Sequence, residues 1–542
     1  MNERVVENWL TSADERTLEV PFCQLLVAEG FRVVHLSRHG EWEQGKDILA
    51  IAPDDTPCAF QLKATGHKVT LAEWASIFPQ IVRLVEVEIT HPSIPPGGAH
   101  RAILVINGEL DEAVRQEISD RNRDWVKRGR PALETWVRND LLPRFLKLHT
   151  NLWPTELHDW KALLELFLAS GDGCLRKPKL SQLLYSTLPF GSDKVKGTSF
   201  VRAVASAAML TSYALQPHEQ KENHVAVIEG WTLYAAHVLA LADCCGIAEK
   251  HWSSSISLAE FAIQQAMLDL VGEIRTRTDL TEGDPVTDGS FRRARVTWLC
   301  ALLAAFCLWR QGTGTIDEAD DVVKDFILRN RTKLELWGEA TLPQILVIIW
   351  YLRRVLATSE TDTMLATLTS SLLQGCLHSG DRGFPDPYHS VAEVSGARLG
   401  LGGDVWDDGV AGHSYGLRTL VDLLTRRNLR QTVHWLWPEV SRCVFVEFIA
   451  PQPWKLCLWH CDKGTVRSTL PKHTQSWSEL QRSSSRIDLS RVPRLLSERP
   501  WLMLLFLIVY PHRLSPDLAK FLDDHYSGPG WMGKTTYEDA TT

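Results

Sequence analysis

The chain has 542 residues, far more than the ~100–200 of a typical domain, so we expect two or three domains and exclude a single small module. Its 44% hydrophobic and 23% charged residues are typical of a folded globular protein and exclude a mainly disordered one. The 58 basic and 66 acidic side chains give a net charge of −8, which excludes a globally basic nucleic-acid coat protein. Any nucleic-acid surface must then be a local patch.

The cysteines and the apolar runs indicate the compartment. The 11 cysteines are scattered without a dense framework, and no leader with a basic start and an apolar core opens the chain, so we expect a reducing cytoplasm. The longest apolar runs, Trp501–Tyr510 and Trp298–Trp309, are shorter than the ~20 residues that cross a bilayer. We therefore interpret them as buried helices and expect no membrane partner.

In the first half of the segment 1–150, the sequence pattern predicts a helix followed by three strands. The opening helix ends at Gly30, a good left-handed stop. Three apolar, β-branched runs then predict strands at Phe31–Leu36, Asp47–Ala52 and Cys58–Lys63. The turn at 53–57 is rich in Pro and Asp, so the second and third strands are expected to form a hairpin.

The second half of this segment continues the α/β pattern. A helix is expected over Leu71–Val87, with a kink or break at Pro79. Arg101–Ile106 then predicts a fourth strand, closed by Asn107 and Gly108. Further helices are expected at Leu110–Lys127 and Ala132–Leu148.

Residues 151–542 have a different pattern. Amphipathic stretches predict helices at 156–170, 197–214, 224–246, 256–277, 293–310 and 341–357. We expect a helical domain over 151–378 and a mixed, mainly helical region over 379–542, with two short strands around 441–461. The expected fold class is thus an α/β N-terminal domain plus a large, mostly α-helical C-terminal region with a few short strands.

The residues that suggest chemistry lie on the predicted hairpin. Strand side chains alternate between faces, so Gln61 and Lys63 share one face, while Leu62 points into the core. Asp47 on the neighbouring strand can meet them. Mg²⁺ prefers oxygen ligands, which the Asp47 carboxylate, the Gln61 amide and the Leu62 carbonyl can supply.

Such a site would suit phosphodiester hydrolysis. A bound metal lowers the pKa of a water molecule and neutralises phosphate charge, and Lys63 would orient or deprotonate that water. The alternative is purely structural, with Asp47 and Lys63 forming an exposed cross-strand ion pair and Gln61 being merely polar.

This arrangement resembles the PD-(D/E)xK nuclease superfamily in its Mrr-like restriction-endonuclease branch, as found in anti-phage defence nucleases. That family has an acidic residue on the first helix, a Gly-x-Asp strand and Gln-x-Lys in place of Glu-x-Lys, matched here by Glu19, Gly45-Lys46-Asp47 and Gln61-Leu62-Lys63. The resemblance covers about residues 10–148, including the order helix, three strands, helix and strand. It implies a restriction-endonuclease-like fold over 1–150.

The resemblance also implies the roles of the site residues. The catalytic residues would be Glu19, Asp47, Gln61 and Lys63. The Mg²⁺ ligands, with Mn²⁺ as an alternative ion, would be Asp47, Gln61, Leu62 and Glu19. Glu19 fits only if its helix begins near it, because Pro21 would disturb a helix interior, and Glu15, one turn earlier, is the alternative.

A basic stretch follows the fourth strand and is a candidate nucleic-acid surface. Its candidate phosphate-binding residues are Arg121, Arg123, Lys127, Arg128 and Arg130. Trp125 and Trp136 lie among them and would stack on bases if exposed, whereas in a solvated helix they would belong to the core.

Three functions follow from these observations. The first is a metal-dependent endonuclease acting on DNA, in bacterial defence by analogy, whose helical body senses a trigger, forms a homo-oligomer, recognises a target or binds a defence-system partner protein. The second is a ribonuclease with the same site. The third is a catalytically silent scaffold or binding protein.

Overall fold

The computed structural model describes residues 2–37, 46–95, 99–148, 157–191, 195, 197–277, 280, 289–314, 317–378, 384–401, 412–460 and 464–527. It divides into two compact units, Met1–Gln265 and Ala266–Thr542. The boundaries expected at residues 150 and 378 do not coincide with this division, because helices of the first 150 residues pack closely on the helices that follow.

The first unit contains a five-stranded mixed sheet in the order β1-β2-β3-β5-β7. Its strands are β1 (Arg32–Leu36), β2 (Ile48–Ile51), β3 (Pro57–Lys63), β5 (Arg101–Ile106) and β7 (Leu133–Trp136). β1, β2 and β3 are antiparallel, whereas β3, β5 and β7 run parallel. The short strands β4 (Lys68–Val69) and β6 (Glu109–Leu110) form a separate pair. The predicted hairpin and fourth strand are therefore confirmed.

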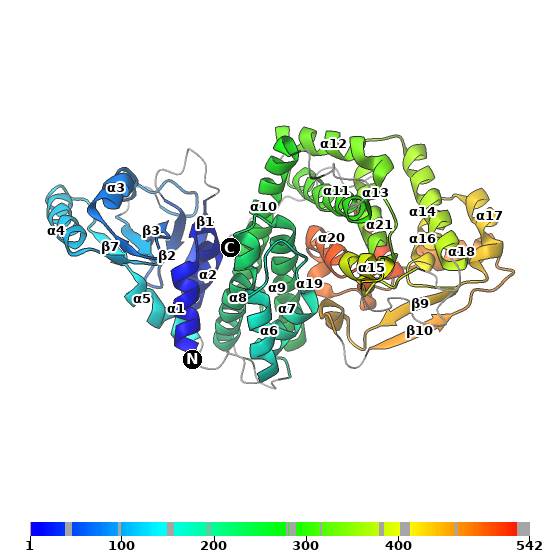
Figure 1. Ribbon diagram of the computed structural model, residues 1–542, viewed down its shortest axis with the longest axis horizontal. Helices are drawn as coiled ribbons and strands as arrows, with labels where there is room; N and C mark the ends of the chain where they lie inside the picture. The colour runs from blue at the N-terminus through cyan, green and yellow to red at the C-terminus, as the bar shows by residue number, and fades with distance from the viewer. Residues whose placement is uncertain are drawn as a thin grey trace. The chain divides into compact units, whose positions relative to one another are not determined.

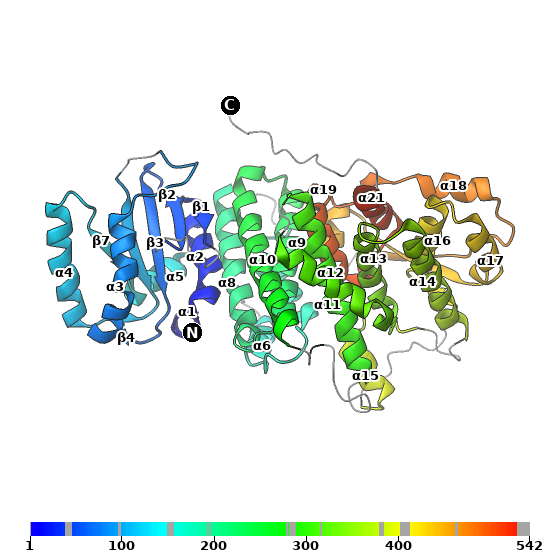
Figure 2. The same cartoon turned by 90° about the horizontal axis from the view of Figure 1, so that it is seen from above.

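Helices cover both faces of this sheet (Figures 1 and 2). The helices of the first unit are α1 (Asn2–Ser12), α2 (Glu15–Ala28), α3 (Leu71–Glu86), α4 (Glu112–Lys127), α5 (Arg138–Leu148), α6 (Leu157–Phe167), α7 (Lys177–Thr187), α8 (Gly197–Glu219), α9 (His224–Cys245) and α10 (Ser253–Thr276), the last of which continues into the second unit. On one face α3 and α4 bury an aliphatic core that includes Leu104, Ile81 and Val114. On the other face Phe22 of α2 packs edge-on against Phe60 of β3 and Trp136 of β7.

Helix α2 ends as its sequence predicts. Gly30 has φ +91°, and the Phe31 N–H donates to the Leu26 carbonyl across it at 2.9 Å. The first strand starts two residues after this glycine, which fixes where the chain leaves the helix and enters the sheet.

Helix α2 also packs along α8, so it lies between the sheet and the following helices of the same unit (Figures 1 and 2). Gln24 and Ser255 of α10 exchange two buried hydrogen bonds, of 3.1 and 2.8 Å. This packing buries α2 on two sides.

The second unit is mainly helical. Its helices are α11 (Gly289–Gly312), α12 (Glu318–Asn330), α13 (Leu342–Leu352), α14 (Thr358–His378), α15 (Val391–Arg398), α16 (Leu417–Arg426), α17 (Arg430–Val440), α18 (Trp477–Ser485), α19 (Arg494–Ser497), α20 (Pro500–Val509) and α21 (Pro516–Ser527). α13 and α20 are buried over their whole length or nearly so. A three-stranded sheet, in the order β10-β9-β8, is built from β8 (His413–Ser414), β9 (Val444–Ile449) and β10 (Thr465–Thr469).

Helix α9 is long and apolar enough to cross a membrane by length and composition. However, 94% of its most apolar window is buried within the protein, as in the central helix of a folded domain. The run expected as a buried helix at Trp501–Tyr510 corresponds to α20.

Three expected elements differ from the structure. Ala132–Leu148 is not one helix, because Leu133–Trp136 pairs with β5 as the edge strand β7 before α5 begins. Helix α3 continues through Pro79 instead of breaking there. Among the described residues of 441–461 only one strand, β9, is present, since Pro453–Cys457 is a 3₁₀ helix and the next strand begins at Thr465.

Candidate active site

The candidate site lies where the start of β2, the end of β3 and the first half of α2 meet. The register pairs Ile48 with Phe60, and the Asp47 N–H donates to the Phe60 carbonyl at 2.9 Å. This extension of the ladder places Asp47 beside Gln61 and Leu62, as the hairpin predicted. Gly45 of the family motif lies outside the described residues.

Asp47 and Gln61 are in direct contact. Oδ2 of Asp47 accepts hydrogen bonds of 2.7 Å from Gln61 Nε2 and from the Leu62 N–H. Both side chains are nearly inaccessible to water, with exposed fractions of 6% for Asp47 and 3% for Gln61. The expected meeting of a carboxylate and an amide is therefore present, and the Leu62 side chain is buried as predicted.

Oε1 of Gln61 is a buried oxygen without a hydrogen-bond donor among the residues that the structure describes. Its amide orientation follows from the hydrogen bond that Nε2 makes to Asp47. A buried amide oxygen with no donor costs about 1–3 kcal/mol unless another group satisfies it. A cation is one such group.

Glu19 is placed near this pair by α2 and is only 5% exposed. Helix α2 begins at Glu15, not near Glu19 as its motif role required, and it contains Pro21 in its interior. Because Pro21 has no N–H, the Thr17 carbonyl has no helical donor, and Ser212 Oγ of α8 donates to it instead at 2.9 Å. Tertiary packing thus removes the objection that the proline raised against Glu19.

Lys63 contacts Glu15. Its Nζ lies 3.2 and 3.3 Å from Oε1 and Oε2 of Glu15, and the side chains are 15% and 37% exposed. The site thus reaches solvent on the side of Lys63 and Glu15, while Asp47 and Gln61 lie deeper. The structural alternative of an exposed Asp47–Lys63 pair is not what the structure shows, because Lys63 pairs with Glu15 and Asp47 is buried.

The electrostatics of Asp47 reflect this arrangement. Burial raises the pKa of the Asp47 carboxyl to about 6, and the negative charges of Glu19 and Glu15 add to the increase. The Leu62 N–H bond and the charge of Lys63 act in the opposite direction. Glu19, Glu15 and Lys63 are thus all close enough to Asp47 to influence its titration.

Asn107 positions both segments that carry the site, a role that the sequence analysis did not assign to it. Its Nδ2 donates to the carbonyls of Leu10 and Ala13, both at 2.8 Å, just before α2 begins. Its Oδ1 accepts from the N–H groups of Thr65 at 2.8 Å and Gly66 at 3.1 Å, just after β3 ends. The signal in the sequence was the Asn-Gly pair that closes the fourth strand.

Gly108 explains why that pair is Asn-Gly. A Cβ atom at this position would lie 1.9 Å from the His67 carbonyl oxygen, so no larger residue fits without moving the backbone. The close approach keeps the loop after Lys63 against the end of β5.

The basic stretch of α4 and the three residues after it remains a predicted phosphate-binding surface, but without the expected base stacking. Trp125 and Trp136 are 3% and 6% exposed, so neither is available to stack on bases. Three of the five basic side chains form ion pairs with carboxylates of the same helix: Arg121 with Glu117, Arg123 with Asp120, and Lys127 with Asp124. Arg128 and Arg130 are exposed at the end of the helix.

Searches of protein-family models, curated proteins and solved structures returned no match to this chain. Within the described part of the chain, no group of three or more His, Cys, Asp or Glu side chains is arranged to hold a metal ion. The candidate site differs from such groups because one of its potential ligands is an amide oxygen.

Proposed function

We propose that the chain is a metal-dependent endonuclease that hydrolyses DNA phosphodiester bonds, with its active site at Asp47, Gln61, Lys63 and Glu19. The observation that carries this proposal is the direct contact of Asp47 with Gln61, which leaves a buried amide oxygen without a donor among the described residues. The order α2, β1, β2, β3, α3 and β5, with α1 before it and the short β4 between β3 and α3, supports a restriction-endonuclease-like domain.

The donor set fits a hard divalent cation. Oxygen atoms of Asp47 and Gln61, together with the Leu62 carbonyl and the Glu19 carboxylate, are the ligand type that Mg²⁺ and Mn²⁺ prefer. A bound Mg²⁺ would supply Lewis acidity toward a phosphate and toward a water molecule. A bound cation would also neutralise the negative charge of Asp47, which burial disfavours, and this favours cation binding.

The protein residues would then act on the phosphate and on the DNA backbone. Lys63 would present its ammonium group to the phosphate and stabilise the charge that develops on the phosphoryl oxygens. Glu15 would hold that ammonium in place from the solvent side. Arg128 and Arg130, which follow α4, are the basic side chains of this stretch best able to contact the DNA backbone, since no ion pair engages them among the described residues.

One assay separates this function from the alternatives of the sequence analysis. Purified protein is incubated with supercoiled plasmid and with structured RNA, in Mg²⁺ and in chelator, beside the variant Lys63→Ala. Plasmid cleavage that requires Mg²⁺ and Lys63 supports a deoxyribonuclease, and RNA cleavage alone indicates the ribonuclease. A folded protein that cleaves neither, also after co-expression with its genomic neighbours, indicates a scaffold.

The second unit is proposed to serve as sensor, oligomerisation surface or target-recognition module, and the defence role and cytoplasmic location are proposals that rest on the family resemblance and the composition. Expression of the protein in a phage-challenged host tests the defence role, and chromatography of the full chain tests oligomerisation. Both measurements are separate from the chemistry of the site.

A further inference from the structure

A cavity lined by charged and hydroxyl- or amide-bearing residues lies in the second unit, where the C-terminal ends of α13, α16, α18 and α21 meet. Its volume is about 460 Å³, within the range of small-molecule sites. Three arginines, two aspartates, four hydroxyl side chains and one glutamine line it. Among the described residues, no aliphatic or aromatic side chain lines it.

The arginines of this cavity have unused hydrogen-bonding capacity. Arg427 is 5% exposed and pairs with Asp523 at 2.9 Å and Asp362 at 3.5 Å. Its Nε, like that of Arg426, is buried without a hydrogen-bond partner among the described residues. Arg353 approaches the same Asp362 oxygen no closer than 3.7 Å, and its Nη1 makes no hydrogen bond within the described part of the chain.

Positive charge is therefore crowded here. Arg353 and Arg427 share one carboxylate, and burial together with the charge of Arg427 lowers the pKa of Arg353. The carbonyl groups at the helix ends balance only part of this positive charge. Arg426 Nη1 donates to one of them, the Ser484 carbonyl at the end of α18, at 2.9 Å.

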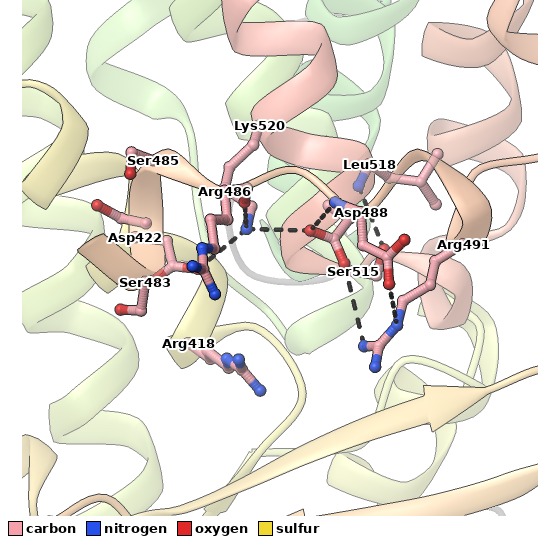
Figure 3. Close-up of polar contacts among 12 residues, drawn as sticks. Arg418, Asp422, Ser483, Ser485, Arg486, Asp488, Arg491, Ser515, Leu518 and Lys520 are labelled. Carbon is pink, nitrogen blue, oxygen red and sulfur yellow. Dashed lines mark hydrogen bonds and ion pairs between the residues drawn. The ribbon is translucent and has the colours of Figure 1, made fainter. Parts of the chain in front are cut away.

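A neighbouring cluster shows what a fully paired network looks like in the same unit (Figure 3). Lys520 points toward Asp422 and donates to the Arg486 carbonyl at 2.6 Å, with Asp517 at 3.0 Å. Arg491 pairs with Asp488 at 3.3 Å in that cluster. None of these side chains has a buried polar atom left without a partner among the described residues, unlike the three arginines of the cavity.

We propose that the cavity binds a phosphorylated sugar, whose phosphate replaces the Asp524 carboxylate as the partner of Arg426. Asp524 is the natural group to be displaced, because it pairs with Arg426 while remaining 55% exposed. The phosphate would give Arg353 and Arg427 a second anion to share, and guanidinium groups bind phosphate through charge-assisted bonds.

The side chains that line the cavity indicate what is attached to the phosphate. A cavity of this size holds more than a phosphate, and its hydroxyl and amide side chains, such as Ser485 and Gln481, match the hydroxyl groups of a sugar. A nucleobase would need an aromatic face for stacking, which the described lining residues do not offer.

Calorimetric titration of the full chain with ribose 5-phosphate, inorganic phosphate and ribose tests the proposal. We expect saturable binding of ribose 5-phosphate, weaker binding of phosphate and none of ribose. Arg426→Gln should weaken the binding about tenfold or more, because it removes a charge-assisted bond. Arg418→Gln, in the cluster of Figure 3, should change it less than about twofold.

Asp524→Asn provides the sharpest comparison, because removing a competing carboxylate should tighten ribose 5-phosphate binding several-fold. The matched control is Asp488→Asn, which removes a carboxylate of similar exposure, 51%, from Arg491. Circular dichroism establishes that each variant is folded. No binding up to about 10 mM, or equal affinities for Asp524→Asn and Asp488→Asn, would overturn the proposal.

Discussion

The ammonium group of Lys63 lies 3.2 and 3.3 Å from the two carboxylate oxygens of Glu15, and so joins the end of β3 to the first turn of α2. The expected acid of this helix was Glu19, and Glu15 was the alternative. The structure instead gives the two carboxylates different places: Glu19 is buried near Asp47, whereas Glu15 contacts the lysine.

This contact predicts a role for Glu15 in positioning Lys63. We expect Glu15→Gln to lower DNA cleavage about tenfold or more, because a misplaced catalytic group is costly, with little change in stability. Glu29→Gln is the control, since it breaks a comparable pair with Arg144 at the other end of α2 and should leave cleavage unchanged. In a Lys63→Ala background Glu15→Gln should have no further effect. Equal losses for Glu15→Gln and Glu29→Gln would contradict the role.

The raised pKa of Asp47 predicts a pH-dependent cost to folding. The folded-state pKa of about 6 exceeds the ordinary value of 3.8, so the contribution of Asp47 to stability is full below pH 4 and is lost as pH rises through 6. Asp47→Asn should therefore increase the free energy of unfolding at pH 7.5 by up to about 3 kcal/mol. Urea denaturation at pH 7.5 and pH 4 measures this. A difference that does not depend on pH would show that the Asp47 carboxyl titrates normally.

Asn107 predicts a link between stability and the geometry of the site. Asn107→Ala removes four hydrogen bonds of a fully buried side chain, so we expect a loss of about 2–4 kcal/mol together with a large loss of cleavage. Asn122→Ala is the comparison, because Asn122 makes two similar bonds to the backbone of Leu133, away from the site. It should lower stability while leaving the cleavage rate of the folded protein intact. If both variants keep that rate, Asn107 does not position the site.

The ion pairs of α4 predict unequal effects on DNA binding for the basic residues within this helix and those just after it. Arg128→Ala with Arg130→Ala should weaken the affinity and reduce its salt dependence, because no carboxylate of the described residues pairs with these side chains. Arg121→Ala with Arg123→Ala should have the smaller effect, since both are already paired. Fluorescence anisotropy over a range of salt concentrations compares the two double variants. A larger effect of Arg121→Ala with Arg123→Ala would contradict this prediction and place the DNA against the ion-paired residues of α4.

The part of the site that the sequence predicted depends on local patterns. Alternation and a Pro- and Asp-rich turn determine the hairpin, and the hairpin alone brings Asp47 beside Gln61. The pairing of Lys63 with Glu15 depends on where α2 begins, which Asp14 decides by capping the Thr17 N–H. Tertiary contacts decide the rest, since Ser212 of α8 satisfies the carbonyl that Pro21 leaves free.

The same distinction explains the errors in the fold. Leu133–Trp136 is short and lacks a turn signal after it, so only its pairing with β5 makes it a strand. Helix α14 was not predicted because it is rich in Ser and Thr, and it is held by buried apolar residues such as Leu365, Leu372 and Cys376. The burial of Trp125 likewise follows from its packing on α3, where its Nε1 donates to Glu86 at 3.1 Å.

The most direct test of the account is a titration of the full chain with Mn²⁺ as the probe, followed by electron paramagnetic resonance, in wild type and in the variants Asp47→Asn, Gln61→Leu and Glu29→Gln. We predict one site in the wild type, lost in Asp47→Asn, weakened about tenfold in Gln61→Leu, where only the amide is removed, and unchanged in Glu29→Gln. Binding that is indifferent to both Asp47 and Gln61, or no binding by a folded wild type, would contradict it.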